Sequence, residues 1–236
     1  MTSMSFKGVT AADMGVVVLD YPPIIKPQAR IKTVTVPGRS GTLTLHDPEA
    51  VYEPVDKTVR CRLLSTASQV AVGAWLSGAG DLILGNESEY SYTARVVEEV
   101  SFEKIMRGYT DRVFEVTFLC QPWKELAQPD ADIALSTNPQ TVVSPATLDS
   151  MPLIQIEGVG AVSINIGSYS FTLSGIESGI PVLVDCDAMT VTNVNQSVSY
   201  LHNMVGQFPR IVPGNNLVTW SGTVSSVVIR PRYRWL

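Results

Sequence analysis

The chain has 236 residues, of which 45% are apolar and 17% are charged, and its formal net charge is −5. This length holds one large domain or two domains of roughly 100–150 residues, and the ordinary Gly, Pro and apolar content excludes a disordered or collagen-like protein. The acidic balance disfavours a nucleic-acid-binding protein, which needs a basic face. The charged fraction lies well below the usual value of about 25%, so we expect part of the surface to be buried against other chains.

The three cysteines, Cys61, Cys120 and Cys186, are odd in number and far apart in the sequence. No Cys-x-x-Cys or Cys/His cluster accompanies them, so we expect free thiols in a reducing compartment, and neither a zinc site nor any other cofactor. The first eight residues lack the apolar core of a signal peptide, so we expect no secretion signal. The long uncharged stretches contain Ser, Asn and Gly, which argues against membrane spans.

The first half of the chain is predicted to be mostly strand with one helix. Apolar and polar residues alternate in three segments, which we predict to be half-buried strands: 57–63, 90–96 and 112–118. An amphipathic helix is predicted at 66–77, with Ser65 or Thr66 as its N-cap and glycines after its end. One apolar stripe of this helix should face a sheet.

Proline becomes frequent between residues 122 and 151, and it is excluded from central strands and helix interiors. Charged residues also fall from 26 in the first 120 positions to 13 in the remaining 116. We therefore predict an N-terminal domain at 1–125, a linker at 126–150 and a C-terminal domain at 151–229.

The second half of the chain is predicted to consist of strands. Alternation over 163–173 is interrupted by Gly167 and Ser168, which predicts a tight hairpin. A strand pair or one bent strand is expected at 182–191, and Pro231 should confine the last strand, 227–236, to an edge or a bend. The predicted fold is mainly β, with two β-sandwich domains of which the N-terminal one carries the single amphipathic helix.

The sequence offers little catalytic chemistry. Its two histidines, His46 and His202, stand outside any metal-binding or nucleophile motif, and we expect His46 to lie in a surface turn. We therefore expect no enzyme activity and no catalytic or metal-binding residue. Asp185 and Asp187 would lie about 7 Å apart on one face of a strand, either solvated or in contact with a cation or saccharide.

The C-terminal arginines, Arg230, Arg232 and Arg234, would share one edge of an acidic protein. Guanidinium groups favour paired hydrogen bonds to carboxylates. We therefore expect these arginines to pair with carboxylates of a neighbouring chain.

Short motifs follow one another in a recognisable order along the chain. In the first half they are VPGRSG at 36–41, Tyr52, a strand followed by a helix that ends at Trp75, YSYTAR at 90–95, FEVTF at 114–118 and QPW at 121–123. In the second half they are PLIQIEG at 152–158, VDCD at 184–187, GQFP at 206–209, PGNN at 213–216 and VIRPR at 228–232. This ordered series covers nearly the whole chain, and it resembles the distal tail protein (Dit) family of phages with long non-contractile tails.

The resemblance implies a structural role without catalysis. Dit-like proteins form a hexameric ring at the tail tip, which joins the tail tube to the adhesion device or tail fibre and lets DNA pass through its lumen. The implied partners are further copies of the chain, the tail tube protein and a tail-tip hub, adhesin or fibre protein, with no membrane anchoring. The implied location is the tail tip of the virion, after assembly in the host cytoplasm.

The resemblance also implies a different role for each domain. An N-terminal β-sandwich with a helix would make the ring, and a galectin-like or carbohydrate-module-like sandwich would lie at the periphery. Residues 230–236 would return to complete the N-terminal domain. A long hairpin between 31 and 62 and free strand edges would supply the contact between subunits. The candidate interface residues are Arg39, Tyr52, Arg60, Arg62, Arg230, Arg232 and Arg234.

Three other readings stay open. The chain could be a saccharide-binding module that contacts the host surface, with Asp185, Asp187, Tyr200 and Trp220 as candidate saccharide contacts. It could be a tail tube protein, which also builds rings from a β-sandwich. The least favoured reading is a cell-wall hydrolase that uses Asp185 and Asp187, because paired catalytic carboxylates usually come from facing strands in a cleft.

Overall fold

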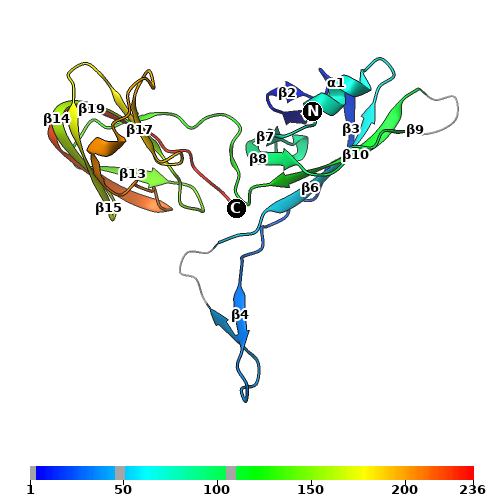
Figure 1. The fold of residues 1–236 in the computed structure, drawn as a ribbon, viewed down its shortest axis with the longest axis horizontal. Coiled ribbons are helices and arrows are strands. Elements are labelled where there is room, and N and C mark those ends of the chain that lie inside the picture. Colours follow the sequence, from blue (N-terminus) through cyan, green and yellow to red (C-terminus); the bar gives the residue numbers. More distant parts are fainter. Residues whose placement is uncertain (1–3, 46–50, 105–109) are drawn as a thin grey trace. The chain divides into compact units, whose positions relative to one another are not determined.

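The computed structural model describes residues 4–45, 51–104 and 110–236. It divides the chain into two compact units, of which the first comprises Met1–Ala127 with Leu236 and the second comprises Gln128–Trp235. Each unit is built around its own β-sheet, and α1 (Gln69–Trp75) is the only α-helix in the described ranges (Figure 1). The mainly β fold predicted from the sequence, with a single helix in the first half, is therefore confirmed.

The first unit contains a nine-stranded sheet whose paired strands are antiparallel. Its main path runs β2 (Val9–Thr10), β1 (Ser5–Phe6), β7 (Ala79–Ile83), β8 (Tyr90–Val96), β10 (Arg112–Cys120), β6 (Val55–Leu63), β3 (Val16–Asp20). Two short strands flank it: β9 (Glu103–Lys104) pairs with β10, and β11 (Glu125–Leu126) pairs with β8. The predicted strands at 57–63, 90–96 and 112–118 are thus confirmed as β6, β8 and β10.

One face of this sheet forms the core of the first unit. Alternate residues of β6 and β10 are buried there: Val59, Cys61 and Leu63 on one strand, Phe114, Val116 and Phe118 on the other. Val72 and Trp75 of α1 pack into the same apolar cluster. The Trp75 indole N–H donates a hydrogen bond of 2.9 Å to the Phe6 carbonyl, so the helix is also fixed by a polar contact to β1.

The helix is shorter than predicted, because the chain makes a turn before it starts. Ser68 is the N-cap, and its Oγ accepts a hydrogen bond from the Ala71 amide at 3.3 Å. The predicted cap at Ser65 or Thr66 is wrong. The Ser65 amide instead donates to an Asp111 carboxylate oxygen, and the Ala67 amide bonds back to the Leu64 carbonyl.

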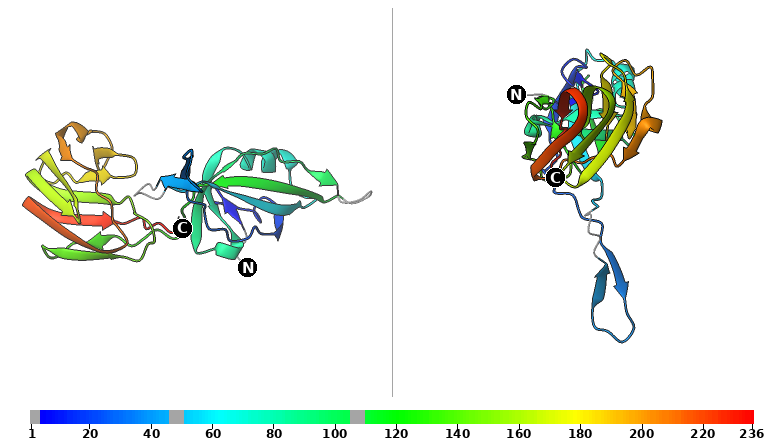
Figure 2. Two further views of the ribbon diagram at one scale, coloured as in Figure 1. Left: turned by 90° about the horizontal axis from the view of Figure 1, so that it is seen from below. Right: turned by 90° about the vertical axis from the view of Figure 1, so that its left-hand side faces the viewer.

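The second unit contains an eight-stranded sheet. Its main path runs β12 (Ile133–Ala134), β19 (Gly214–Arg230), β14 (Leu153–Ile166), β15 (Tyr169–Ile176), β18 (Met204–Gly206). Away from this path, β13 (Gln140–Ser144) pairs with β19, and β16 (Val182–Asp185) pairs with β14 and with β17 (Thr190–Asn193). The long strands β14 and β19 curve side by side (Figure 2).

Two sequence predictions for the second unit are confirmed and one is corrected. The hairpin at Gly167 and Ser168 joins β14 to β15, and the segment 182–191 forms the strand pair of β16 and β17. The last strand does not continue to 236. It ends at Arg230, directly before Pro231, and it pairs on both sides instead of forming an edge.

The segment 126–150 differs from the predicted linker. It carries β12 and β13, both of which pair with β19, and Val142 of β13 is buried in the core of the second unit. The prolines that suggested a linker lie outside these two short strands, before β12, between β12 and β13, and after β13. The second unit therefore runs from 128 to 235, whereas the sequence suggested 151–229.

Candidate functional site

The described residues contain no obvious catalytic or metal-binding constellation. Within 4–45, 51–104 and 110–236, no group of three or more His, Cys, Asp and Glu side chains is arranged to hold a metal ion. No helix of this described part has the length and hydropathy of a membrane span. The candidate residue His46 falls outside the described residues. The features considered below are therefore two surfaces and a group of ion pairs.

The first surface is a hairpin formed by β4 (Lys32–Thr35) and β5 (Thr42–Leu45), which pair with each other as a separate two-stranded sheet (Figure 1). We call residues 24–45 the arm. All four residues of β4 are exposed, and the candidate residue Arg39 lies exposed in the turn between the strands. The arm is therefore a surface feature with no core of its own.

The base of the arm is held by contacts that sequence reasoning missed. The Arg30 guanidinium makes two hydrogen bonds to the Glu53 carboxylate, at 2.6 and 3.0 Å. The candidate residue Tyr52 lies beside them, where it forms a backbone bridge with Ala29. The pairing of Arg30 with Glu53 could not be predicted from the sequence, because residues 23 positions apart share no helix turn or strand face.

The second surface is an acidic groove of about 600 Å³ over β10. Its charged lining consists of five carboxylates and one guanidinium, contributed by Asp56, Arg60, Glu98, Glu99, Glu103 and Glu115. Thr58 and Thr117 contribute hydroxyls that hydrogen-bond to each other at 3.1 Å. The face of the sheet opposite the core thus carries a strong surplus of negative charge.

The candidate residues Arg60 and Arg62 lie along this exposed side of β6. Arg60 Nε is 3.9 Å from a Glu115 oxygen, and both side chains are more than half exposed. Arg62 Nε is 3.8 Å from an Asp111 oxygen. The Arg60 pair is long and exposed, so it contributes little to stability and Arg60 can exchange partners. Arg62 differs, because its Nε is buried without a hydrogen bond and Asp111 is only 18% exposed.

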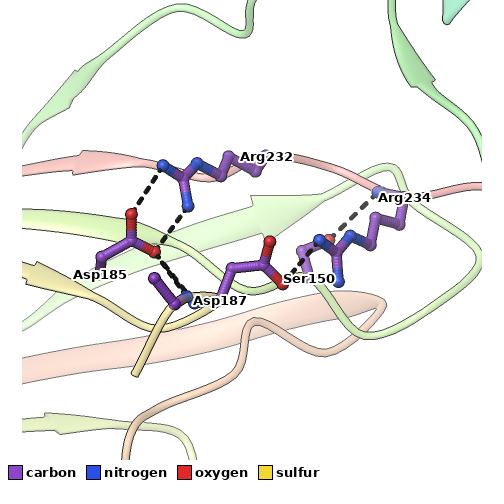
Figure 3. Close-up of polar contacts among 6 residues, drawn as sticks. Ser150, Asp185, Asp187, Arg232 and Arg234 are labelled. Carbon is purple, nitrogen blue, oxygen red and sulfur yellow. Dashed lines mark hydrogen bonds and ion pairs between the residues drawn. The ribbon is translucent and has the colours of Figure 1, made fainter. Parts of the chain in front are cut away.

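The third feature is a ladder of three ion pairs along the C-terminal segment. Arg230 pairs with Asp132 at 2.7 and 2.9 Å, and Arg232 pairs with Asp185 at 2.8 and 3.1 Å. Arg234 donates to Asp187 at 2.9 Å, and its amide donates to the Ser150 hydroxyl (Figure 3). All of these partners belong to the second unit of the same chain.

This ladder corrects two expectations. The three arginines were expected to pair with a neighbouring chain, but their carboxylate partners lie 47 or 98 residues away in their own unit. Residues 230–235 likewise belong to the second unit, with only Leu236 grouped with the first. The physical reason is that β19 runs between strands of its own sheet and delivers the following residues beside β16.

The same ladder occupies the carboxylates proposed as saccharide contacts. Burial pushes the pKa of Asp185 upward, but hydrogen bonds from Arg232 and from the amides of Ala188 and Asp187 outweigh it, so its pKa is lowered overall. Tyr200 is buried and Trp220 is partly buried against the core. In the described structure, no hydrogen bond joins Tyr200 or Trp220 to either aspartate, so the four residues do not form one polar site.

A buried ionic network in the first unit was also missed by sequence reasoning. The Glu87 carboxylate accepts hydrogen bonds from Lys57 at 3.1 Å, Lys124 at 2.9 Å and the Tyr92 hydroxyl at 2.8 Å. Lys57 is only 2% exposed, and its ammonium lies 4.3 Å from the centre of the Tyr92 ring. The network ties β6, β8 and the end of the first unit to η1 (Gly85–Glu87).

Comparison with known proteins finds a similar fold in solved structures of two phage proteins. No family model matches the chain, and no curated protein matches it. The crystal structure of the Dit protein (gp 19.1) of phage SPP1 covers 99% of this chain and 99% of its own, with a TM-score of 0.77 at 12% identity. That protein is described as a paradigm of the hub adsorption apparatus in phages that infect Gram-positive bacteria.

A second solved structure supports the same grouping. The structure of the phage p2 baseplate in its activated conformation with Sr contains a chain that matches 94% of this one over 92% of its own length. The TM-score is 0.57 and the identity is 6%. The resemblance to Dit proteins is thus confirmed at the level of the fold, and the structural neighbours of this chain are hub and baseplate proteins of phages.

Proposed function

We propose that the chain is a distal tail protein that builds the hub at the tail tip of a phage with a long non-contractile tail. The observation that carries this proposal is the match to the SPP1 Dit protein over both units at once. A match confined to one sheet would indicate a common building block, since one fold serves many functions. A match over 99% of both chains means that the same two units occur in the same order.

In this role the first unit forms a closed hexameric ring, which joins the tail tube to an adhesin or fibre protein and leaves a lumen for DNA. The second unit lies at the periphery as a galectin-like module. The low charge of the chain fits subunits that bury two lateral faces. When the rotation between neighbouring subunits closes into a ring, the same contacts cannot build an open fibre. The hub acts as a scaffold at the tail tip of the virion, after assembly in the host cytoplasm, and it has no catalytic step.

The proposal is tested by particle mass and images of the purified protein. Mass photometry and negative-stain microscopy should show a particle of about six copies with an open centre, alone or after addition of the tail tube protein. A particle that stays monomeric under both conditions contradicts the proposal. Within the residues that the structure describes, Asp185 and Asp187 hydrogen-bond to Arg232 and Arg234, which argues against the saccharide-binding alternative. A glycan array with the full chain would test it independently.

A further inference from the structure

Another hollow of the first unit lies at the base of the arm. It has a volume of about 430 Å³ and lies over the paired ends of β8 and β10. We call it the arginine pocket, because Arg30 and Arg95 are the charged side chains among its described lining residues. Its lining also includes Tyr52, Leu119 and Trp123. It shares no lining residue with the acidic groove, so the two hollows are separate sites.

The sheet fixes the position of Arg95 in this pocket. On β8, Arg95 pairs with Ala79 of β7 on one side and with Leu119 of β10 on the other. Ala94, the residue before it, is buried in the core, so Arg95 points to the opposite, outward face of the sheet. Ala79 and Leu119 also line the pocket, so the Arg95 side chain has apolar neighbours on both adjoining strands.

The two arginines differ in the charge that they leave available. Arg30 donates two hydrogen bonds to Glu53, at 2.6 and 3.0 Å, so its charge is already neutralised. Arg95 is exposed, and its side chain makes no hydrogen bond or ion pair with any described residue. No carboxylate is among the described residues of the pocket lining. A single guanidinium in this state can bind a carboxylate through two parallel hydrogen bonds, whereas a nucleic acid needs several positive charges.

The rest of the lining indicates what would lie beside that carboxylate. Tyr52 and Trp123 are both partly buried, and both belong to the lining. Tyr, Trp and Arg are the residue types that carry most of the binding energy at contacts between proteins. The volume of about 430 Å³ lies within the range of roughly 300–1,000 Å³ that is typical of ligand pockets. The pocket therefore suits a short segment that combines an apolar side chain with a carboxylate.

We propose that the arginine pocket binds a peptide segment of a partner protein in which a carboxylate stands next to an apolar side chain. The carboxylate would pair with Arg95, and the apolar side chain would pack against Tyr52 and Trp123. The carboxylate belongs either to an acidic side chain or to a chain terminus, since both present the same two oxygens. The inference goes beyond the proposed function, because it names a contact site that does not depend on ring formation.

Three short peptides with acetylated amino ends test the pocket in the full-length protein, each containing 4-fluorophenylalanine for ligand-observed fluorine NMR. The first has Glu after the aromatic residue and an amidated end, and the second ends at the aromatic residue with a free carboxylate. The third is neutral, with Gln in place of the Glu of the first. At least one acidic peptide should bind with a Kd on the order of 1 mM or below, and the neutral peptide about tenfold more weakly. The acidic peptide that binds more tightly identifies the source of the carboxylate.

Variants of the protein show whether the carboxylate pairs with Arg95. Arg95→Gln should weaken the tighter acidic peptide about tenfold and leave the neutral peptide unchanged, because only the charged pair is lost. Arg95→Lys should recover part of the loss, since it keeps the charge but not the planar fork. The control variant Arg39→Gln makes the same change in net charge at an exposed site outside the pocket, and it should bind all three peptides like the wild type.

A photocrosslink locates the bound peptide and completes the test. With benzoylphenylalanine in place of the fluorinated residue, adducts should map to segments that contain Tyr52 or Trp123. Adducts confined to other segments, equal losses in Arg95→Gln and Arg39→Gln, or no binding of either acidic peptide would overturn the inference and leave the proposed function standing. A wild-type chain that forms no ring but binds an acidic peptide through Arg95 supports the inference and contradicts the proposed function.

Discussion

Replacing Glu87 by Gln should destabilise the first unit by about 3–5 kcal/mol, because it removes the counter-charge of a buried lysine. Lys57 is 2% exposed, and Glu87 is its ion-pair partner within the described residues. The Tyr92 hydroxyl would also lose a charged acceptor. Lys124, whose side chain is 15% exposed, can turn its ammonium toward water and should add little to the cost.

The contrast between variants makes this prediction specific. Lys57→Met leaves Glu87 paired with Lys124, so it should cost less than about 1.5 kcal/mol. The double variant Lys57→Met with Glu87→Gln removes both buried charges and should be more stable than Glu87→Gln alone. Urea unfolding followed by hydrogen exchange of β6 and β8 peptides would measure the loss, with peptides of the second unit as the internal reference. Equal costs for the two single variants would refute the argument.

The same network predicts the effect of acid. Burial raises the pKa of Glu87, but the hydrogen bonds from Lys124, Tyr92 and Lys57 outweigh burial, so its pKa lies below the ordinary 4.5. A lowered pKa contributes stability above the unfolded value, and this contribution disappears as the pH falls through the folded value. The difference in stability between the wild type and Glu87→Gln should therefore shrink below pH 4.5 and stay constant between pH 6 and 8.

Three further predictions follow from local geometry. Burial raises the pKa of the Cys61, Cys120 and Cys186 thiols to about 12. At pH 8 a thiol reagent should therefore label none of them until the chain unfolds. Rapid labelling of the folded protein would contradict their burial. Arg232→Gln should cost the second unit about 1–3 kcal/mol in thermal unfolding, whereas the more exposed Arg230→Gln should cost less than about 1 kcal/mol. Gly206→Ala would place Cβ 2.4 Å from a backbone oxygen, whereas at Gly167 no atom lies within 4 Å of such a Cβ. Gly206→Ala should therefore lower the free energy of unfolding by well over the roughly 1 kcal/mol expected for Gly167→Ala. Equal losses in urea unfolding would contradict this.

Alternation along the chain was sufficient to predict the strands whose two faces differ. In β6 the buried face carries Val59, Cys61 and Leu63. Because every second residue of a strand points to the same face, this pattern also predicts that Lys57 is buried, as the structure shows. The partner of Lys57 could not be predicted, because Glu87 lies 30 residues away in a short 3-10 turn. The ion pair of Asp132 and Arg230 spans 98 residues and depends on the pairing of β12 with β19.

The strands missed by the sequence are those whose signal is weak against their surroundings. β12 has two residues and β13 has five, and prolines at 139 and 145 frame β13 closely. Both strands exist because β19 offers backbone groups for pairing, which is a tertiary effect. The predicted helix start was wrong for a related reason. Asp111 holds the Ser65 amide and Ala67 closes a turn onto the Leu64 carbonyl, so the helix begins only after Ser68.

The position of β19 in the strand order constrains how the protein is made. β12, β13 and β14 all pair with β19, so the sheet of the second unit cannot close until residues 214–230 have left the ribosome. The sheet of the first unit needs nothing beyond β11, which ends at Leu126. During synthesis the first unit can therefore fold long before β19 is available to pair with β14. Chaperone binding or aggregation should be most frequent while this edge of β14 has no partner strand.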